Sequence, residues 1–154
     1  MSRRHIEKKI AVLPDPIYNS RIAELFVRQI MRKGKKSLAY KLFYKSMNRV
    51  SKITKKNPLT IMGKAIHYAT PLIETKALKN NKTIQKLPKE VLKRRGTLIA
   101  IRWILMACRK NKGKSITYNL ANELIDASNK TGYAVKKKEE MHKMAEANKA
   151  FLKR

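Results

Sequence analysis

Residues 98–108 read LIAIRWILMAC, and Arg102 is the one charged side chain in this run. A helix that is apolar on nearly all sides is normally buried among its neighbours in a larger fold. The run is shorter than the roughly 18 apolar residues that a membrane span needs. We therefore expect a helix that begins near Arg95 and forms the centre of a folded core.

Three helices are predicted before this run, because apolar side chains recur there at helical spacing. Ser20 is a good N-cap residue for the first helix, and Gly34 is placed to end it. Asn57 followed by Pro58 starts the third helix, which we expect to end near Pro71. The expected inward-facing residues are Ile22, Leu25, Phe26 and Ile30 in the first helix, Ala39, Leu42, Phe43, Met47, Val50 and Ile53 in the second, and Ile61, Met62, Ala65, Ile66 and Ala69 in the third.

Residues 72–93 do not keep a helical period. A short alternating stretch leads to the polar residues 79–82, and a second short stretch follows that we expect to end at Pro88. Two short strands joined by a polar turn are typical of a β-hairpin. Lysines recur along the whole segment, so we expect a basic hairpin between the third and fourth helices.

Two further helices are predicted after the central run. Ser115 caps the first of them, and residues 129–132 break the pattern before a last helix that runs from about Ala134 to the end. The expected inward-facing residues are Ile116, Leu120, Leu124 and Ala127 in the fifth helix and Met141, Met144, Ala145 and Phe151 in the sixth.

The fold class expected from these patterns is all-α. One domain, residues 1–154, would form a six-helix bundle with a protruding basic β-hairpin at 72–93 and a basic N-terminal arm at 1–14. A chain of this length is most simply one domain.

The chain carries far more positive charge than a fold requires. Its 154 residues include 38 Lys and Arg against 10 Asp and Glu, a formal net charge of +28, while 43% of the residues are hydrophobic. That apolar content suffices for a core, but the uncompensated charge repels itself and destabilises the compact state. A polyanion is the natural compensation, and the composition therefore favours a nucleic-acid-binding protein.

The positive charge is concentrated in the first two-thirds of the chain. Residues 1–56 hold 16 basic and 3 acidic side chains, residues 57–113 hold 13 and 2, and residues 114–154 hold 9 and 5. We expect the nucleic-acid contacts in the basic clusters of the arm, the helix junction, the hairpin and the central helix. The candidate RNA-binding residues are Arg3, Arg4, Lys8, Lys35, Lys36, Lys76, Lys79, Arg94, Arg95, Arg102, Arg109, Lys110 and Lys114.

Several other classes of protein are excluded by the residues present. Cys108 is the one cysteine, so an internal disulfide is impossible, and it reads as a small core residue. The histidines His5, His67 and His142 lack metal-ligand spacing. No phosphate-cradling glycine loop or nucleophile motif occurs. We therefore expect no enzyme, no catalytic residue, no cofactor and no metal. The N-terminus leads to no apolar signal segment, which predicts a soluble protein of a reducing compartment.

The composition also leaves open two other classes of protein. A basic DNA-packaging protein would also explain the net charge, although charge spread around six helices is less typical of it than a charged tail. A peripheral membrane protein would need one basic helix with a bulky exposed apolar face. Co-sedimentation with ribonucleoprotein particles, chromatin or membranes separates these classes.

Blocks of the sequence match a known family. They are Asp15-Pro16 with Tyr18, GKKSLAY at 34–40, NPL at 57–59, Arg102-Trp103, LANEL at 120–124, AVKKKE at 134–139 and MAEANKAF at 144–151. Through these blocks the chain resembles, over nearly its whole length, the bacterial and plastid form of the small-subunit ribosomal protein seven family. The last block is the most specific, because composition alone would not produce its order.

The resemblance implies a structural constituent of the small ribosomal subunit. Family members have an all-helical body with a hairpin arm, bind the 3′ major domain of small-subunit ribosomal RNA and begin assembly of the subunit head. They lie beside other head and platform proteins, near the messenger exit path and the tRNA exit site. By position, the resemblance also implies RNA contacts for Arg3, Arg4, Lys35, Lys36, Lys76, Lys79, Arg95, Arg102 and Arg109.

The hairpin tip departs from the family pattern. Leu78 stands where the family has a basic residue, and Asn81-Lys82 stands where it has two glycines. The opening residues 1–4 and the block at 37–40 look like plastid members, and the excess of lysine over arginine agrees with an AT-rich organellar genome. We therefore expect a ribosome of the plastid (chloroplast) stroma, with the bacterial cytoplasm as the alternative.

Overall fold

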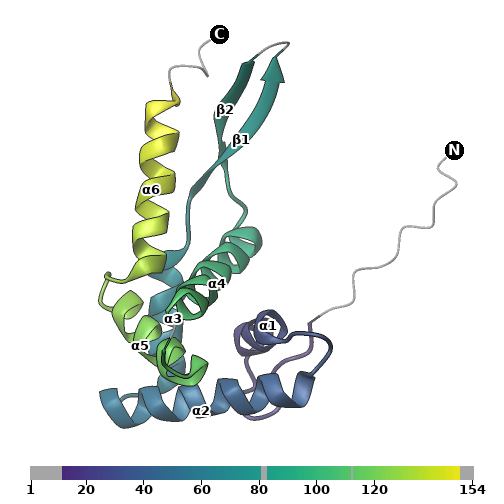
Figure 1. The fold of residues 1–154 in the computed structure, drawn as a ribbon, viewed down its shortest axis with the longest axis vertical. Helices are drawn as coiled ribbons and strands as arrows, with labels where there is room; N and C mark the ends of the chain where they lie inside the picture. Colours follow the sequence, from purple (N-terminus) through teal and green to yellow (C-terminus); the bar gives the residue numbers. More distant parts are fainter. Residues whose placement is uncertain (1–11, 81–82, 112, 150–154) are drawn as a thin grey trace, which may run out of the picture.

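The computed structural model describes residues 12–80, 83–111 and 113–149. Within these residues it contains six helices and one two-stranded antiparallel sheet, so the predicted all-α body with a hairpin between the third and fourth helices is confirmed (Figure 1). The elements are α1 (Arg21–Ile30), α2 (Lys36–Thr54), α3 (Pro58–Ala69), β1 (Ile73–Asn80), β2 (Thr83–Glu90), α4 (Lys93–Lys110), α5 (Ile116–Ser128) and α6 (Tyr133–Ala147).

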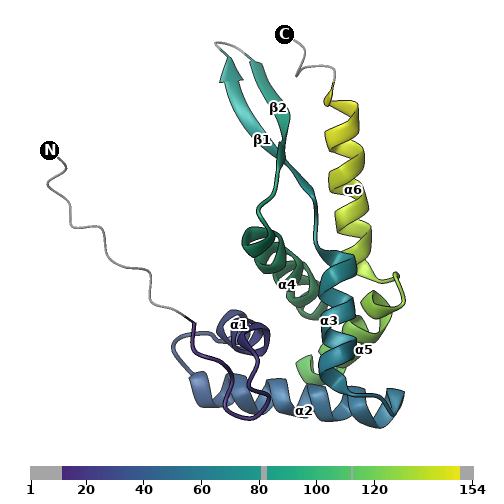
Figure 2. The same cartoon turned by 180° about the vertical axis from the view of Figure 1, so that it is seen from behind.

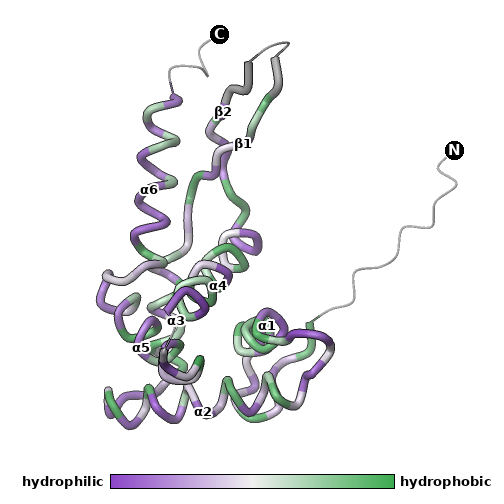
Figure 3. The backbone as a smooth tube through the Cα atoms, viewed as in Figure 1, coloured by the Kyte–Doolittle hydropathy of each residue, from purple (hydrophilic) through white to green (hydrophobic). Residues whose placement is uncertain are grey.

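Two helices occupy the middle of the body. Helix α4 contacts α1, α3, α5 and α6, and helix α5 contacts α2, α3, α4 and α6. Helix α2 runs along the base, while α6 and the hairpin stand together and extend away from the body in both views (Figures 1 and 2). Helix α6 contacts both strands and is largely hydrophilic along its length (Figure 3). The molecule therefore has a packed body and a two-part projection.

The central run forms the buried part of α4, as predicted. Ile101, Ile104 and Leu105 are almost fully buried, whereas Arg102 faces solvent. The helix begins two residues earlier than predicted, at Lys93.

Gly96 lets the first turn of α4 approach the end of α3. A Cβ atom at this position would lie 2.9 Å from Cγ2 of Thr70 and 3.3 Å from the carbonyl oxygen of Pro71. Contacts this close mean that any side chain at residue 96 would push the helix away from the base of the hairpin.

The three predicted N-caps are confirmed. The Ser20 hydroxyl accepts a hydrogen bond from the N–H of Ala23, and the Asn57 side chain accepts one from the N–H of Leu59 at 2.9 Å. The Ser115 hydroxyl accepts a bond from a backbone N–H in the first turn of α5. Each cap satisfies a backbone donor that has no partner inside its own helix.

Some residues that were expected to face inward are exposed. Ile22, Ile53 and Met144 have 37%, 52% and 41% of their surface exposed. In α1 the core face is turned toward Ala23 and Val27, and Ile53 lies in the last turn of α2. Met144 lies on the exposed side of α6, whereas its neighbour Ala145, which was also expected to face inward, is 2% exposed. The expectation for Phe151 lies outside the described residues.

The second strand does not end at Pro88 as predicted. It continues to Glu90, with Pro88 paired opposite Thr75. A two-stranded sheet has two open edges, and proline is tolerated in an edge strand because an outward-facing backbone position donates no ladder hydrogen bond.

Buried acidic residues fasten α1 and the segment before it to α2. Asp15 is 1% exposed, and its carboxylate accepts hydrogen bonds from the N–H of Tyr18 at 2.8 Å and from the hydroxyl of Tyr44 at 2.9 Å. Glu24 is also buried and accepts a bond of 2.6 Å from the hydroxyl of Tyr40. That bond, together with burial, raises the pKa of Tyr40 to about 12, so its hydroxyl stays a donor.

A third buried carboxylate holds the start of α6. Glu123, in α5, accepts a hydrogen bond of 2.9 Å from the N–H of Ala134, where α6 has no side-chain cap of its own. Burial raises the pKa of Glu123. Gly132 precedes the helix with a φ of +91°, and a Cβ there would lie 3.2 Å from the Glu123 carboxylate. A glycine is required at this turn for both reasons.

A histidine joins the base of the hairpin to α6. The N–H of Leu72 donates to Nε2 of His142 at 3.1 Å, which requires an imidazole that is unprotonated at Nε2. Burial, with the charge of Lys138 next in importance, lowers the pKa of His142 below 6.5. The folded state therefore binds this proton less readily than the unfolded chain does. The stability from the contact is present above about pH 6.5 and is lost as the pH falls below it.

We accordingly expect the free energy of unfolding to fall by about 1 kcal/mol between about pH 7.5 and about pH 5.5 because of this contact. The measurement is urea unfolding at both pH values. His142→Gln should flatten this step, whereas His67→Gln, at an exposed position of α3, should leave it unchanged. Equal pH dependence in the wild type and in His142→Gln would contradict the assignment.

Candidate nucleic-acid interface

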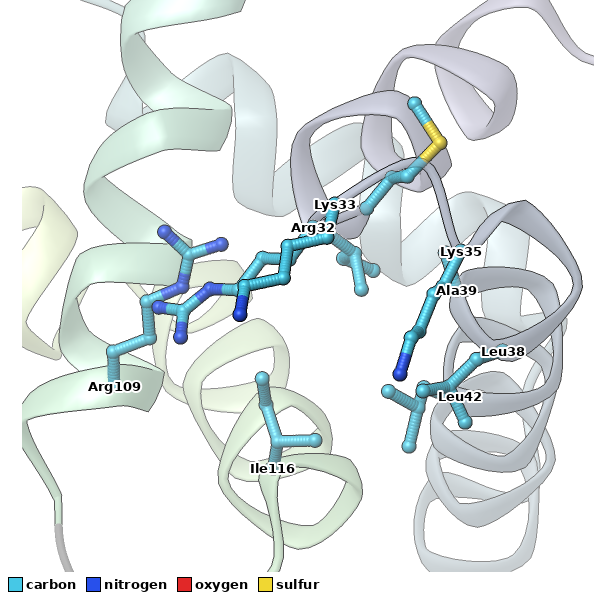
Figure 4. A pocket seen from close by; sticks show the side chains of 10 residues that line it. Arg32, Lys33, Lys35, Leu38, Ala39, Leu42, Arg109 and Ile116 are labelled. Atoms are coloured by element: carbon cyan, nitrogen blue, oxygen red, sulfur yellow. The ribbon is translucent and has the colours of Figure 1, made fainter.

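A groove on one face of the body collects cationic side chains from separate parts of the sequence. It has a volume of about 680 Å³ and lies between the α1–α2 junction, α4 and the start of α5 (Figure 4). None of the residues that line it is acidic. We call it the arginine groove; its lining residues are Ile30, Met31, Arg32, Lys33, Lys35, Leu38, Ala39, Leu42, Arg109 and Ile116.

The backbone of the α1–α2 junction turns its basic residues into the groove. Lys33 and Gly34 both have left-handed backbone conformations, with φ angles of +51° and +73°, and the N–H of Lys35 bonds the carbonyl of Arg32 at 3.1 Å. Such a conformation costs free energy at a lysine, and strained residues of this kind cluster at functional sites. Lys35 is the N-cap residue of α2 and makes no side-chain cap bond. The positive end of the α2 dipole therefore adds to the charge of the side chains.

Arg109 reaches the groove from α4 and is held in place there. Its Nη2 donates to the carbonyl oxygen of Gln29, at 3.1 Å, in the last turn of α1. Figure 4 shows the side chains of Arg32 and Arg109 reaching toward one another. Burial, and then the charge of Arg32, lower the pKa of Arg109. Two like charges held near each other without a carboxylate raise the energy of the empty groove, and an anion between them would lower it.

Two smaller hollows adjoin the same corner of the fold. One is lined by the basic face of α2, with Lys45, Arg49 and Lys52, and by Thr117 of α5. The other is lined by Lys110, Asn111, Lys114, Tyr118, Asn119, Asn122, Glu123 and Asp126. The first turn of α5 contributes to all three hollows, so basic side chains of α1–α2, α2 and α4 gather around it.

Tyrosine rings hold several of these cations. The guanidinium carbon of Arg49 lies 4.1 Å from the centre of the Tyr118 ring, and Nζ of Lys114 lies 4.6 Å from it. Lys110 lies 5.3 Å from the ring of Tyr133. Cation–π contacts of this kind orient a cation without neutralising it. These side chains therefore keep their full charge for an external anion.

Other predicted residues are partly neutralised inside the protein. Nε of Arg95 lies 2.8 Å from the carboxylate of Glu74, an ion pair that ties α4 to β1. Nζ of Lys36 lies 3.6 Å from the buried carboxylate of Glu24. For these two residues the structure offers a structural role in addition to the predicted one.

The remaining candidates are spread over the molecule. Lys76, Arg94 and Arg102 are exposed on β1 and α4, and the arginine groove does not include them. Lys79 pairs with Ile84 at the far end of the hairpin. The candidates of the arm, Arg3, Arg4 and Lys8, lie outside the described residues. The structure thus brings Lys35 together with Arg109, and places Lys110 beside Lys114.

Five cationic residues that line these hollows were not among the predicted RNA-binding residues: Arg32, Lys33, Lys45, Arg49 and Lys52. Arg32 opens the run RKGKK at 32–36, so its place beside other basic residues was a usable signal. Arg49 follows Lys45 by one helical turn on the outer face of α2, a pattern that is also typical of a solvated face. Nothing in the sequence placed these residues next to α4 or α5.

The described residues contain no cluster of three or more histidine, cysteine or acidic side chains that would hold a metal ion. None of the helices found there is long and apolar enough to cross a membrane. Cys108 is buried, as predicted, and burial raises the pKa of its thiol to about 12. It is therefore protonated at neutral pH and unsuited to nucleophilic chemistry.

Comparison with known proteins decides the family. The family model described as Ribosomal protein S7p/S5e matches residues 2–149. The chain belongs to this family. It is thus a structural, non-enzymatic protein of the small ribosomal subunit, as the sequence predicted.

The S7p/S5e assignment is supported by relatives that align along almost the full chain. The small ribosomal subunit protein uS7c of Prototheca wickerhamii is 57% identical over 153 residues, which cover 99% of this chain and 98% of the relative. The uS7c protein of Chlorella vulgaris is 54% identical with the same coverage. The uS7 protein of the cyanobacterium Synechococcus elongatus is 46% identical over 151 residues, 98% of this chain and 97% of the relative.

Proposed function

We propose that this protein binds the 3′ major domain of small-subunit ribosomal RNA and begins assembly of the subunit head. The observation that carries the proposal is the arginine groove with its adjoining basic hollows, on a chain of the S7p/S5e family. Neighbouring head and platform proteins, the messenger exit path and the tRNA exit site complete the proposed surroundings. The projecting hairpin is the element that would reach toward the exit site.

Recognition by phosphate contacts and RNA shape explains the residues best. The corner formed by α1, α2 and the α4–α5 connection carries Arg32, Lys35, Arg49, Arg109 and Lys114 on a rigid helical frame. Folded RNA presents closely spaced phosphates at fixed positions, so a rigid set of cations reads its shape. The predicted contacts of the arm and the hairpin would extend this surface along the RNA.

The direct test is footprinting on small-subunit ribosomal RNA. We expect the full chain to protect nucleotides within the 3′ major domain, and to leave the other domains unprotected at the same concentration. Duplex DNA is the competitor that tests the alternative of a DNA-packaging protein. Displacement of the protein by duplex DNA as readily as by the 3′ major domain would favour that alternative.

Charge reversal at Lys35 should weaken RNA binding without unfolding the helices. Lys35→Glu removes a groove cation from an exposed position, and we expect an affinity loss of about tenfold or more in low salt. Lys36→Glu should weaken binding too, but it also places a carboxylate next to the buried Glu24, so its melting temperature should fall further. Filter binding with the 3′ major domain transcript and thermal melting measure the two effects.

The matched control for this series is Lys136→Glu. Lys136 is exposed in the first turn of α6 and lines none of the three hollows. A carboxylate is favourable near the N-terminus of a helix, so the substitution should not destabilise α6. Lys136→Glu changes the net charge of the protein by the same amount as Lys35→Glu. Equal affinity losses for the two variants would show that net charge alone matters, and would count against the assigned surface.

A plastid ribosome is the proposed location. The Prototheca and Chlorella relatives are chloroplast-type uS7c proteins, and a cyanobacterial uS7 protein also matches. Within the plastid the proposed compartment is the stroma. Fractionation of the source organism's plastids, with detection of this chain in small ribosomal subunits, tests the location.

A further inference from the structure

The arginine groove has an apolar wall that phosphate binding does not require. Leu38 lies on this wall with 50% of its surface exposed, Leu42 lies beside it on α2, and Ile116 lines the groove from α5; the last two are half-buried. In Figure 4 Leu38 and Leu42 lie together on α2, Ile116 lies across from them on α5, and Arg32 and Arg109 reach in above Ile116. The groove therefore offers cations and an apolar surface to the same ligand.

We propose that the arginine groove is a subsite for one unpaired nucleotide of RNA. The phosphate lies between the guanidinium groups of Arg32 and Arg109, and the ribose and base lie on the apolar wall. This inference rests on the proposed RNA-binding function and deepens it, because it names the kind of nucleotide that the groove accepts.

The cationic side of the groove fits a phosphate. Arg109 uses one N–H for the carbonyl of Gln29, which fixes its orientation and leaves further guanidinium donors for a ligand. Arg32 is exposed beside it, and Lys35 faces the same space (Figure 4). Arginine pairs bind phosphate oxygens through several directed hydrogen bonds. An anion in this position would remove the repulsion between the two guanidinium groups.

The apolar side of the groove fits a nucleoside whose base is not paired. In an A-form duplex the base faces are stacked and the deep major groove is too narrow for side chains to read the bases. A duplex can therefore offer phosphates to Arg32 and Arg109, but no base face to Leu38. An unpaired base in a loop or a bulge can place its face on the wall. The volume of about 680 Å³ falls in the usual range of small-ligand sites, roughly 300–1,000 Å³.

The test uses the full chain with ¹³C-labelled leucine and isoleucine methyl groups. Three RNA probes are titrated in low salt: a short single strand, the same strand built from abasic nucleotides, and a fully paired duplex of equal length. We expect the methyl signals of Leu38, Leu42 and Ile116 to shift with the single strand, because the ring current of a base acts at close range. The abasic strand and the duplex should leave these signals nearly unchanged although both bind.

Variants separate the apolar wall from the cations. Leu38→Gln should lower the affinity for the single strand about fivefold and leave the affinity for the duplex unchanged. Ile53→Gln is the matched control, since Ile53 is an equally exposed apolar residue of α2 outside the groove. Arg32→Gln should weaken binding of both RNA forms and reduce the salt slope by about 1. It serves in place of an Arg109 variant, which would also lose the bond to Gln29.

The outcomes distinguish the two proposals. A protein that binds none of the three RNA probes in low salt would overturn the proposed function itself. If RNA binds but the three methyl groups do not move, and Leu38→Gln behaves like Ile53→Gln, the proposed function stands and the nucleotide subsite is wrong. A shift of the same methyl groups caused by a small-subunit protein, with no shift caused by RNA, would likewise overturn the subsite.

Discussion

Raising the salt concentration from about 50 to about 200 mM will weaken binding to the 3′ major domain RNA about 10³–10⁵-fold. The expectation follows from six to ten phosphate contacts, a modest number for a chain with a net charge of +28. Each neutralised phosphate releases a condensed counterion, and added salt opposes this release. The measurement is the dissociation constant as a function of salt concentration, plotted on logarithmic axes.

Unfolding by salt is excluded by a parallel melting experiment. Added salt screens repulsion between the cations of the free protein, so its melting temperature should stay constant or rise over the same range. A weak salt dependence, corresponding to one or two phosphate contacts, would contradict an interface spread over several helices. It would indicate that most of the basic residues are merely solvated.

The second large effect concerns the core. Phe43→Ala should lower the free energy of unfolding by about 3–5 kcal/mol, because it removes a fully buried ring and leaves a cavity. The Phe43 ring lies 6.1 Å from that of Phe26 in α1, 6.3 Å from that of Tyr18 and 5.9 Å from that of Tyr44, centre to centre. It therefore joins α1, α2 and the segment before α1.

Urea unfolding followed by circular dichroism measures this loss. The matched control is Leu38→Ala on the same helix, where half of the side-chain surface is already exposed and the expected loss is about 1 kcal/mol or less. Equal losses for the two variants would mean that the aromatic cluster is not the junction between α1 and α2.

The local features of the fold could be predicted from the sequence. The run at 98–108 marked a central helix, and Ser20, Asn57 and Ser115 marked helix starts, because a cap acts on backbone groups within three residues of itself. The loss of helical period after Pro71 marked the hairpin. In each case the signal lies within the element whose structure it determines, or directly beside it.

The relative placement of elements could not be predicted in the same way. Met144 and Ala145 were both assigned to the core, but the pattern of α6 does not say which of these adjacent residues faces its packing partners, and Met144 is 41% exposed while Ala145 is buried. The strand beyond Pro88 was missed for a similar reason, since the penalty of a proline depends on which edge of the sheet it faces.

The sequence predicted several residues of the candidate site, but it did not predict how they are arranged in space. Lys35 and Arg109 were both chosen as members of basic clusters, but their shared groove depends on packing between α1, α2 and α4. The role of Glu24 in neutralising Lys36 depends on the same packing. The arm residues Arg3, Arg4 and Lys8 stay predictions.

The inward placement of the acids has a consequence for the life of the protein outside the ribosome. Asp15, Glu24 and Glu123 are buried, and no lysine or arginine is buried among the described residues. Three of the few carboxylates are therefore removed from the surface. The solvent-exposed surface is more cationic than the composition suggests. A copy made in excess of its RNA will adhere to the nearest polyanion, whatever that is.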